Sequence, residues 1–185
     1  MGEQHKKHNR REHLNDFHLN VAGEYVYDGA LYACQNDDAK QRRSKRAVWG
    51  MAAILTVAVA AGGCIPAPGM QNCFYVLLPY LGEFLGAASV IWALAKLGTD
   101  WSTVREYNYK KSVAVLPVRT AVTAVFSLLG IVCELIFFFV NDHAGQTFFA
   151  LLYVLLKLTA LLSVLVLRAE IMQAEWDKLP KKNNS

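Results

Sequence analysis

The sequence predicts an all-α membrane protein, a bundle of four transmembrane helices with a short β-hairpin near the N-terminus. More than half of its 185 residues are hydrophobic (54%), and they are concentrated in four long blocks. Each block approaches or exceeds the roughly 18 to 20 apolar residues that cross the hydrocarbon core of a bilayer. The segments between the blocks differ in positive charge, as the loops of multi-pass proteins do. The predicted spans are residues 47–65, 73–97, 116–140 and 147–167.

The distribution of Lys and Arg predicts the orientation of these spans. A basic run precedes the first span, and the second connecting segment and the tail are also basic. The first connecting segment carries no charge, and the third holds only Asp142 and His143. Because positive loops stay inside, we expect a plasma-membrane protein with both termini in the cytoplasm. The run lacks interleaved aromatic residues, so we expect no nucleic-acid partner. It consists of Lys40, Arg42, Arg43, Lys45 and Arg46.

Residues 1–22 read as a disordered arm, basic and rich in histidine. The arm has too few apolar residues to bury a core of its own. Its histidines, together with Cys34, would be candidate zinc ligands, but their spacing matches no structural zinc pattern, so we expect no metal. These histidines are His5, His8, His13 and His18.

Residues 23–46 contain the predicted hairpin followed by the basic run. Asp28-Gly29 separates two β-prone aromatic segments, 24–27 and 30–33, and Asp-Gly in that position is a strong hairpin signal. An isolated hairpin is only marginally stable, so its aromatic face should contact something else. That face would pack against headgroups or the cytoplasmic loop, or dock a partner protein. It comprises Tyr25, Tyr27 and Tyr32.

Two cysteines bracket the loop between the first two spans. Cys64 and Cys73 fall on the predicted outer side, where disulfides persist. They would form a disulfide that links the two helices, or remain as free thiols. A redox-active pair is disfavoured because the loop lacks the C-x-x-C spacing.

The second span carries a packing motif. Gly82 and Gly86 form a G-x-x-x-G pair, which favours close helix packing within the chain or with a second copy.

Two polar segments outside the spans each carry a tryptophan. The segment after the second span places Trp101 among charges, which predicts an interfacial helix lying on the membrane. Residues 168–185 read as a polar cytoplasmic tail, with Trp176 as an interface anchor.

A polar seam runs along the third span. Small and polar residues recur there at helical spacing, on one face of an otherwise apolar helix. The seam should face protein, since a carboxylate facing lipid is costly. The fourth span carries Lys157, with Tyr153 one turn away. The seam consists of Thr120, Thr123, Ser127, Gly130 and Glu134, and Tyr153 adds to it from the fourth span.

Three ionisable residues are predicted to form a buried ionic cluster. At about 1.5 Å of rise per residue, Glu83, Glu134 and Lys157 lie at similar depths in the outer half of the bundle. Two carboxylates and one ammonium leave one excess negative charge, which a proton or a cation would neutralise. Two interpretations follow. Either one Glu–Lys pair fixes the bundle while the other Glu is protonated and bonded to a hydroxyl, or the cluster serves coupled transport.

Three short motifs carry a resemblance to a known group of proteins. The motifs are Tyr25-x-Tyr27-x-Gly29-x-x-Tyr32, Leu77-Leu78-Pro79-Tyr80 and Tyr109-Lys110-Lys111-Ser112. With them the sequence resembles uncharacterised small four-span membrane proteins of anaerobic Gram-positive bacteria, over most of the chain. The resemblance implies a fold and no activity.

The sequence leaves two hypotheses for function, neither of them enzymatic. The spans have no histidine, and the chain has no phosphate loop and no His-Glu-x-x-His motif, so we expect neither an enzyme nor a cofactor. The first hypothesis is an accessory subunit in the lipid bilayer, which engages a second copy or a larger membrane complex through its hairpin, loop and tail. The alternative is a small proton- or cation-coupled transporter that uses Glu83, Glu134 and Lys157.

Overall fold

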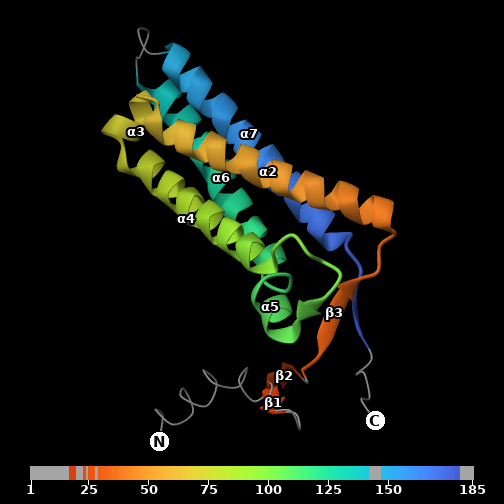
Figure 1. The fold of residues 1–185 in the computed structure, drawn as a ribbon. Coiled ribbons are helices and arrows are strands. Elements are labelled where there is room, and N and C mark those ends of the chain that lie inside the picture. The colour runs from red at the N-terminus through yellow and green to blue at the C-terminus, as the bar shows by residue number, and fades with distance from the viewer. Residues whose placement is uncertain (1–16, 20–22, 24, 28, 142–146, 180–185) are drawn as a thin grey trace, which may run out of the picture.

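The computed structural model describes residues 17–19, 23, 25–27, 29–141 and 147–179. Its four longest helices are each long and apolar enough to cross a membrane. Successive long helices run in opposite directions, so α2 begins and α7 ends at the same end of an elongated bundle (Figure 1). We call this the sheet end and the opposite one the loop end. The helices are α2 (Asp38–Cys64), α4 (Phe74–Leu97), α6 (Leu116–Val140) and α7 (Thr147–Met172).

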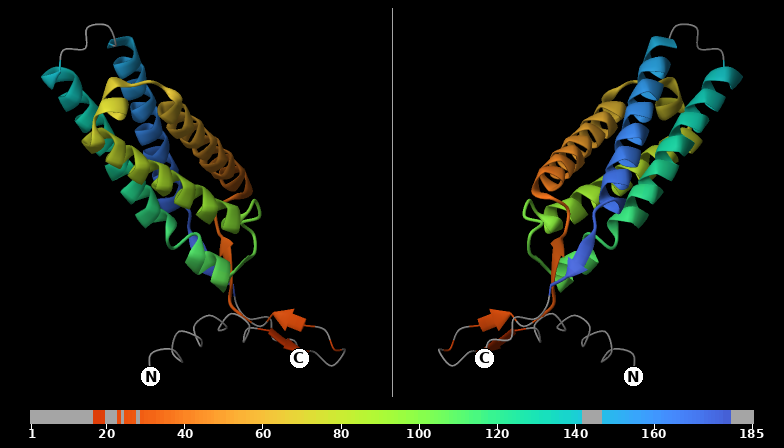
Figure 2. Two further views of the ribbon diagram at one scale, coloured as in Figure 1. Left: turned by 90° about the vertical axis from the view of Figure 1, so that its left-hand side faces the viewer. Right: turned by 90° about the vertical axis from the view of Figure 1, so that its right-hand side faces the viewer.

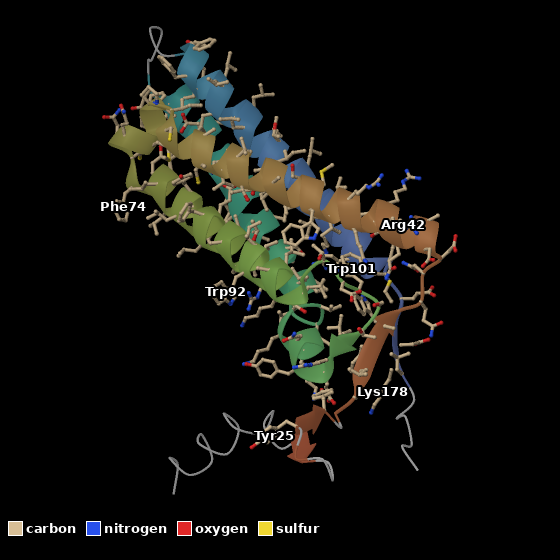
Figure 3. All side chains as sticks on the ribbon, in the orientation of Figure 1. Tyr25, Arg42, Phe74, Trp92, Trp101 and Lys178 are labelled. Atoms are coloured by element: carbon tan, nitrogen blue, oxygen red, sulfur yellow. The ribbon has the colours of Figure 1, made fainter. Side chains whose placement is uncertain are left out.

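The helices pack through small residues and keep large apolar ones outside. The closest pairs are α2 with α7, α4 with α6, and α6 with α7, and Figure 2 shows these helices side by side along the bundle. The buried stripe of α2 includes Ala52, Ala58 and Gly62, which let neighbouring backbones approach closely. Phe74 and Trp92 on α4 point away from the bundle (Figure 3). The outer surface is therefore largely apolar along α4, α6 and α7, as contact with lipid requires, while the first turns of α2 expose Arg42, Arg43 and Arg46.

The predicted spans recur as these helices with different ends. The range 116–140 coincides with α6, while α7 continues beyond residue 167 to Met172. α2 begins at Asp38 rather than at residue 47, because the basic run before the span consists largely of Lys, Arg and Gln, which are good helix formers.

A three-stranded antiparallel sheet covers the sheet end. Its central strand, β3 (Leu31–Cys34), lies between β4 (Val104–Arg105) and β5 (Trp176–Lys178). Main-chain bonds outside the ladder extend the pairing, for example from Cys34 N–H to the Trp101 carbonyl at 3.0 Å. The sheet therefore joins the N-terminal segment, the loop after α4 and the tail.

An aromatic core connects this sheet to the helices. Trp101 is only 2% exposed and lies at the junction of bundle and sheet (Figure 3). Its ring centroid is 5.8 Å from that of Trp176, which is 5.9 Å from that of Tyr109. Tyr32 stacks on Tyr109 at 4.2 Å. Trp101, Tyr109 and Trp176 belong to or pack against the same hydrophobic cluster as the buried ends of α4 and α7, so the sheet and the bundle share one core.

The predicted pairing across Asp28-Gly29 is wrong. Strand β2 (Tyr25–Tyr27) pairs instead with β1 (Phe17–Leu19), antiparallel, with Leu19 opposite Tyr25. Tyr32 of β3 lies opposite Val104 and Lys178. Since β4 and β5 occupy both edges of β3, no edge remains there for β2.

The prediction that Trp101 turns toward the membrane from an interfacial helix is also wrong. Within the segment between α4 and α6, α5 spans only Glu106–Lys111, and Trp101 precedes it in the protein core. Trp176 is half-buried and packs on the same aromatic core, and its role as an interface anchor stays a prediction.

The loop end is closed by a short helix, α3 (Pro68–Asn72). It lies between α2 and α4 in the chain and contacts α4, α6 and α7. Ala67 is fully buried, and Pro68 and Gly69 are buried with it. The connection between the first two spans is therefore folded back over the bundle. The predicted histidine arm at residues 5, 8 and 13 and the tail at 180–185 lie outside the described residues.

Candidate functional site

The polar face of α6 points into the bundle along its whole length. Thr120, Thr123, Ser127 and Glu134 have no exposed surface, and Gly130 is buried between them. The threonine hydroxyls donate to carbonyls of their own helix, at 2.9 Å for Thr120 to Leu116 and 2.8 Å for Thr123 to Arg119. Such bonds satisfy a hydroxyl locally, so both threonines are neutral lining groups.

An ion pair forms the centre of the site. Lys157 on α7 donates to one carboxylate oxygen of Glu83 on α4. Ser127 on α6 donates to the other oxygen at 2.6 Å. Glu83 is fully buried and Lys157 is 2% exposed. Three helices thus meet at one carboxylate whose two oxygens are both occupied, which is what a buried ion pair requires to be tolerated.

Two aromatic rings enclose the ammonium of this pair. The Nζ atom of Lys157 lies 4.5 Å from the ring centroid of Tyr80 and 5.1 Å from that of Tyr153. At these distances the ring faces attract a cation. The Tyr80 hydroxyl donates to the Val59 carbonyl at 3.4 Å, so α2 also contributes to the site. The Tyr153 hydroxyl is buried and makes no hydrogen bond with any described residue.

Glu134 is the second acid of the site and is surrounded differently. It is fully buried, yet neither oxygen makes a hydrogen bond within the described part of the chain. The backbone of Gly69 in α3 lies against the carboxylate, and a Cβ atom at Gly69 would collide with it. The Gly69 backbone N–H faces the carboxylate but lies outside hydrogen-bond geometry, so α3 covers Glu134 at the loop end and offers it one weak donor.

Gly130 separates the two acids on the side facing Lys157. A Cβ atom there would lie 3.6 Å from Cε and 3.9 Å from Nζ of Lys157. Ser127 precedes Gly130 by one turn and Glu134 follows it by one turn, so all three share one face of α6. The sequence did not determine which of the two acids forms an ion pair with Lys157. The structure brings Lys157 to Glu83 and leaves Glu134 apart.

The G-x-x-x-G pair lies in the contact between α4 and α6. A Cβ atom at Gly82 would meet the ring of Phe126 at 2.5 Å, and one at Gly86 would lie 3.3 Å from the Cα of Thr123. Both glycines therefore permit a close approach of two helices of the same chain. This approach sets Glu83, between them, against Ser127.

The remaining candidate residues lie away from this site. Cys64 is exposed and Cys73 half-buried, and both are free thiols. Tyr25 is 75% exposed and lies far from the bundle (Figure 3). Tyr27 donates to the Ala30 carbonyl at 3.3 Å and lies under the Arg105 guanidinium. Since Tyr32 stacks on Tyr109, two of the three candidate docking tyrosines make contacts within the fold.

Sequence reasoning missed two contributors to the site, Tyr80 and Gly69. Tyr80 precedes Glu83 by three residues, a spacing that places both on one helical face, so the signal was present. Gly69 follows a proline in a loop without charge, and nothing in such a loop indicates that it folds back over an acid. Within the described residues, no three His, Cys, Asp or Glu side chains gather to hold a metal ion.

The fold and the site define a class: a small helical protein with four apolar helices of membrane-spanning length and an ionic site in their core. Comparison with known proteins found no match to a family model, to a curated protein or to a solved structure. The function is therefore argued from the site.

Proposed function

We propose that this protein is a small, non-enzymatic carrier that couples transport to the exchange of a proton or a cation at Glu134. The observation that supports this proposal is the state of that carboxylate, which is fully buried and makes no hydrogen bond within the described residues. A charged carboxylate in such a place is very unfavourable unless a cation lies beside it. Glu134 is therefore neutral as the acid, or it holds a cation.

The Glu83–Lys157 pair makes Glu134 the exchangeable group. Lys157 and Ser127 occupy both oxygens of Glu83, so the pair is neutral as a whole and already satisfied. No described residue forms an ion pair with Glu134. An acid within a span is a functional-site hypothesis by default, and one at the predicted outer end, under a five-residue helix, is close to one bulk phase.

Proton flux in liposomes tests this proposal. Purified protein is reconstituted, a pH step is applied with a sodium, potassium or methylammonium salt on one side, and internal pH is followed with a trapped dye. We expect flux in the wild type and none in Glu134→Gln, with unchanged melting in detergent. Glu106→Gln is the matched control, because Glu106 pairs with Lys110 at 2.6 Å in α5, outside the bundle core, and should leave the flux unchanged. Wild-type flux equal to that of protein-free liposomes refutes the carrier.

A second candidate is an accessory subunit that engages another chain at the sheet end. The observation that favours it is Tyr25, which is 75% exposed on a strand pair that extends from the sheet away from the bundle (Figure 1). A photo-crosslinking residue at position 25 should then trap one defined product, with the mass of two chains if the partner is a second copy. The same residue at exposed Ser102 is the control. Absence of a product specific to position 25 refutes this candidate.

A further inference from the structure

We propose that the bundle core binds a small primary ammonium ion, at the position that the Lys157 ammonium occupies in the structure. This inference rests on the carrier function proposed above and names its substrate class. We call the surrounding groups the ammonium site: Glu83, Ser127, Tyr80 and Tyr153. They come from α4, α6 and α7 and enclose one nitrogen atom.

The chemistry of the ammonium site suits an ammonium better than a metal ion. Glu83 supplies the counter-charge, and the 2.6 Å bond from Ser127 fixes the orientation of its carboxylate. The rings of Tyr80 and Tyr153 present their faces to the nitrogen at 4.5 and 5.1 Å. Aromatic faces recognise alkylammonium ions, whereas hard metal ions require a shell of oxygen ligands. The present occupant, a lysine ammonium, is itself a primary ammonium on an alkyl chain.

Lys157 has a second carboxylate within reach when a free ion takes its place. The lysine stem passes directly over Gly130, where a Cβ atom would lie 3.6 Å from its Cε, so α6 presents no side chain to the stem at this level. Glu134 lies one turn beyond Gly130, which is about 6 Å along the helix. A lysine stem can shift its head by several ångströms. The oxygens of Glu134, which make no hydrogen bond of good geometry within the described residues, would then accept the displaced ammonium.

Charge balance fixes the stoichiometry of this exchange. In the observed arrangement, Glu83 and Lys157 neutralise each other, and Glu134 is neutral when it carries a proton. When an ammonium ion binds Glu83 and Lys157 moves to Glu134, two carboxylates face two ammonium groups. The only bond that breaks is the O–H bond of Glu134, whose proton leaves to water. One ammonium ion therefore enters for each proton released, which keeps the buried site neutral in both states.

Proton release by the wild-type protein is the first test. Protein in weakly buffered detergent with an indicator dye is titrated with methylammonium chloride, and we expect about one proton released per chain at saturation. Sodium chloride and tetramethylammonium chloride, which offers no N–H donor to Glu83, should release none. Glu83→Gln and Glu134→Gln should abolish the release. Lys96→Ala is the matched control, because Lys96 lies over Trp92 at 5.3 Å on the exposed face of α4 and should release normally.

Chemical rescue of Lys157→Ala is the second test. This variant empties the ammonium site, so it should melt below the wild type, and methylammonium should restore several degrees by binding the folded state. Sodium should not do so, and neither ion should rescue the double variant Glu83→Gln/Lys157→Ala. If Lys157→Ala does not fold, the proton-release titration decides alone.

Each outcome supports or overturns the inference. No proton release in the wild type, or equal responses to sodium and methylammonium, would overturn it. An amine response without proton flux in liposomes would keep the binding site and refute the carrier. Proton flux without an amine response would support the carrier and refute the ammonium site.

Discussion

Removal of one partner of the Glu83–Lys157 pair should cost far more stability than removal of both. Lys157→Met leaves the Glu83 carboxylate buried with Ser127 as its one donor, and Glu83→Gln leaves a buried ammonium between two tyrosine rings. Breaking a buried pair in this way typically costs about 3–5 kcal/mol. For a chain of this size, 1 kcal/mol corresponds to roughly 2–4 °C, so each single variant should melt roughly 6–20 °C below the wild type.

The double variant Glu83→Gln/Lys157→Met should recover most of that loss, because no charge is left unpaired. The two single losses sum to about 6–10 kcal/mol, so the coupling energy from the cycle should exceed about 3 kcal/mol, where independent sites would add to within about 0.5 kcal/mol. Melting in detergent, followed by circular dichroism, measures all four proteins. The matched cycle pairs Lys157→Met with Glu134→Gln and should show little coupling, since Glu134 does not contact Lys157 in the observed state. Stronger coupling to Glu134 than to Glu83 would refute the assignment of the pair.

Three further predictions concern packing, the sheet end and orientation. Gly86→Ala should lower the free energy of unfolding by about 1–3 kcal/mol, because the added methyl group forces α4 away from Thr123. Gly50 has open space around it, so Gly50→Ala should be neutral or stabilising. An equal effect of both substitutions would contradict the close approach of α4 and α6. Trp176→Ala should lower the melting temperature clearly more than Trp92→Ala, since Trp176 packs on Trp101 and Tyr109 and Trp92 is 63% exposed; a larger effect at Trp92 would argue against the aromatic core. In a variant without native cysteines, an impermeant thiol reagent should label exposed Gln71→Cys from outside and spare exposed Ser102→Cys, and labelling at position 102 would reverse the topology.

The spans could be predicted because length and composition determine them. A helix of lipid-spanning length must be almost wholly apolar, so the four blocks mark the four helices, and Pro117 near the start of α6 is at a position where proline is tolerated. The side of each helix was harder to predict. The α6 face could be predicted because hydroxyls and a carboxylate recur at helical spacing, and the structure buries all of them.

The sheet could not be predicted because nothing local encodes it. Its outer strands have two and three residues and lie some 70 residues or more from β3 in the chain. Asp28-Gly29 gave a strong local signal for pairing 24–27 with 30–33, but β3 gains more from two neighbours and the buried Trp101. Whether Trp101 and Trp176 lie at an interface or in the core also depends on tertiary structure, because tryptophan is common in both places.

The choice between Glu83 and Glu134 as the partner of Lys157 depends on geometry that no spacing contains. It requires the relative rotation of α4, α6 and α7, and the close approach at Gly82 and Gly86 that brings Glu83 to Ser127. Depth alone placed both acids within reach of a flexible lysine. The folding of α3 over Glu134 depends on contacts with three helices, so the sequence could not show that the two acids differ.

The two ends of the bundle differ in how firmly they are closed, and this difference bears on the exchange at Glu134. At the sheet end, β3 bonds to the loop after α4 and to the tail after α7, with main-chain bonds from Gln35 to Glu175 and from Leu179 to Leu31. Opening this end would break a sheet and an aromatic core together. At the loop end, the five residues of α3 cover the acid, and the glycine against it contributes no side chain. Displacement of α3 alone would expose Glu134 while the Glu83–Lys157 pair stays in place. Access to Glu134, where we propose the exchange, therefore requires least disruption from the loop end, which the charge pattern predicts to be the outer side.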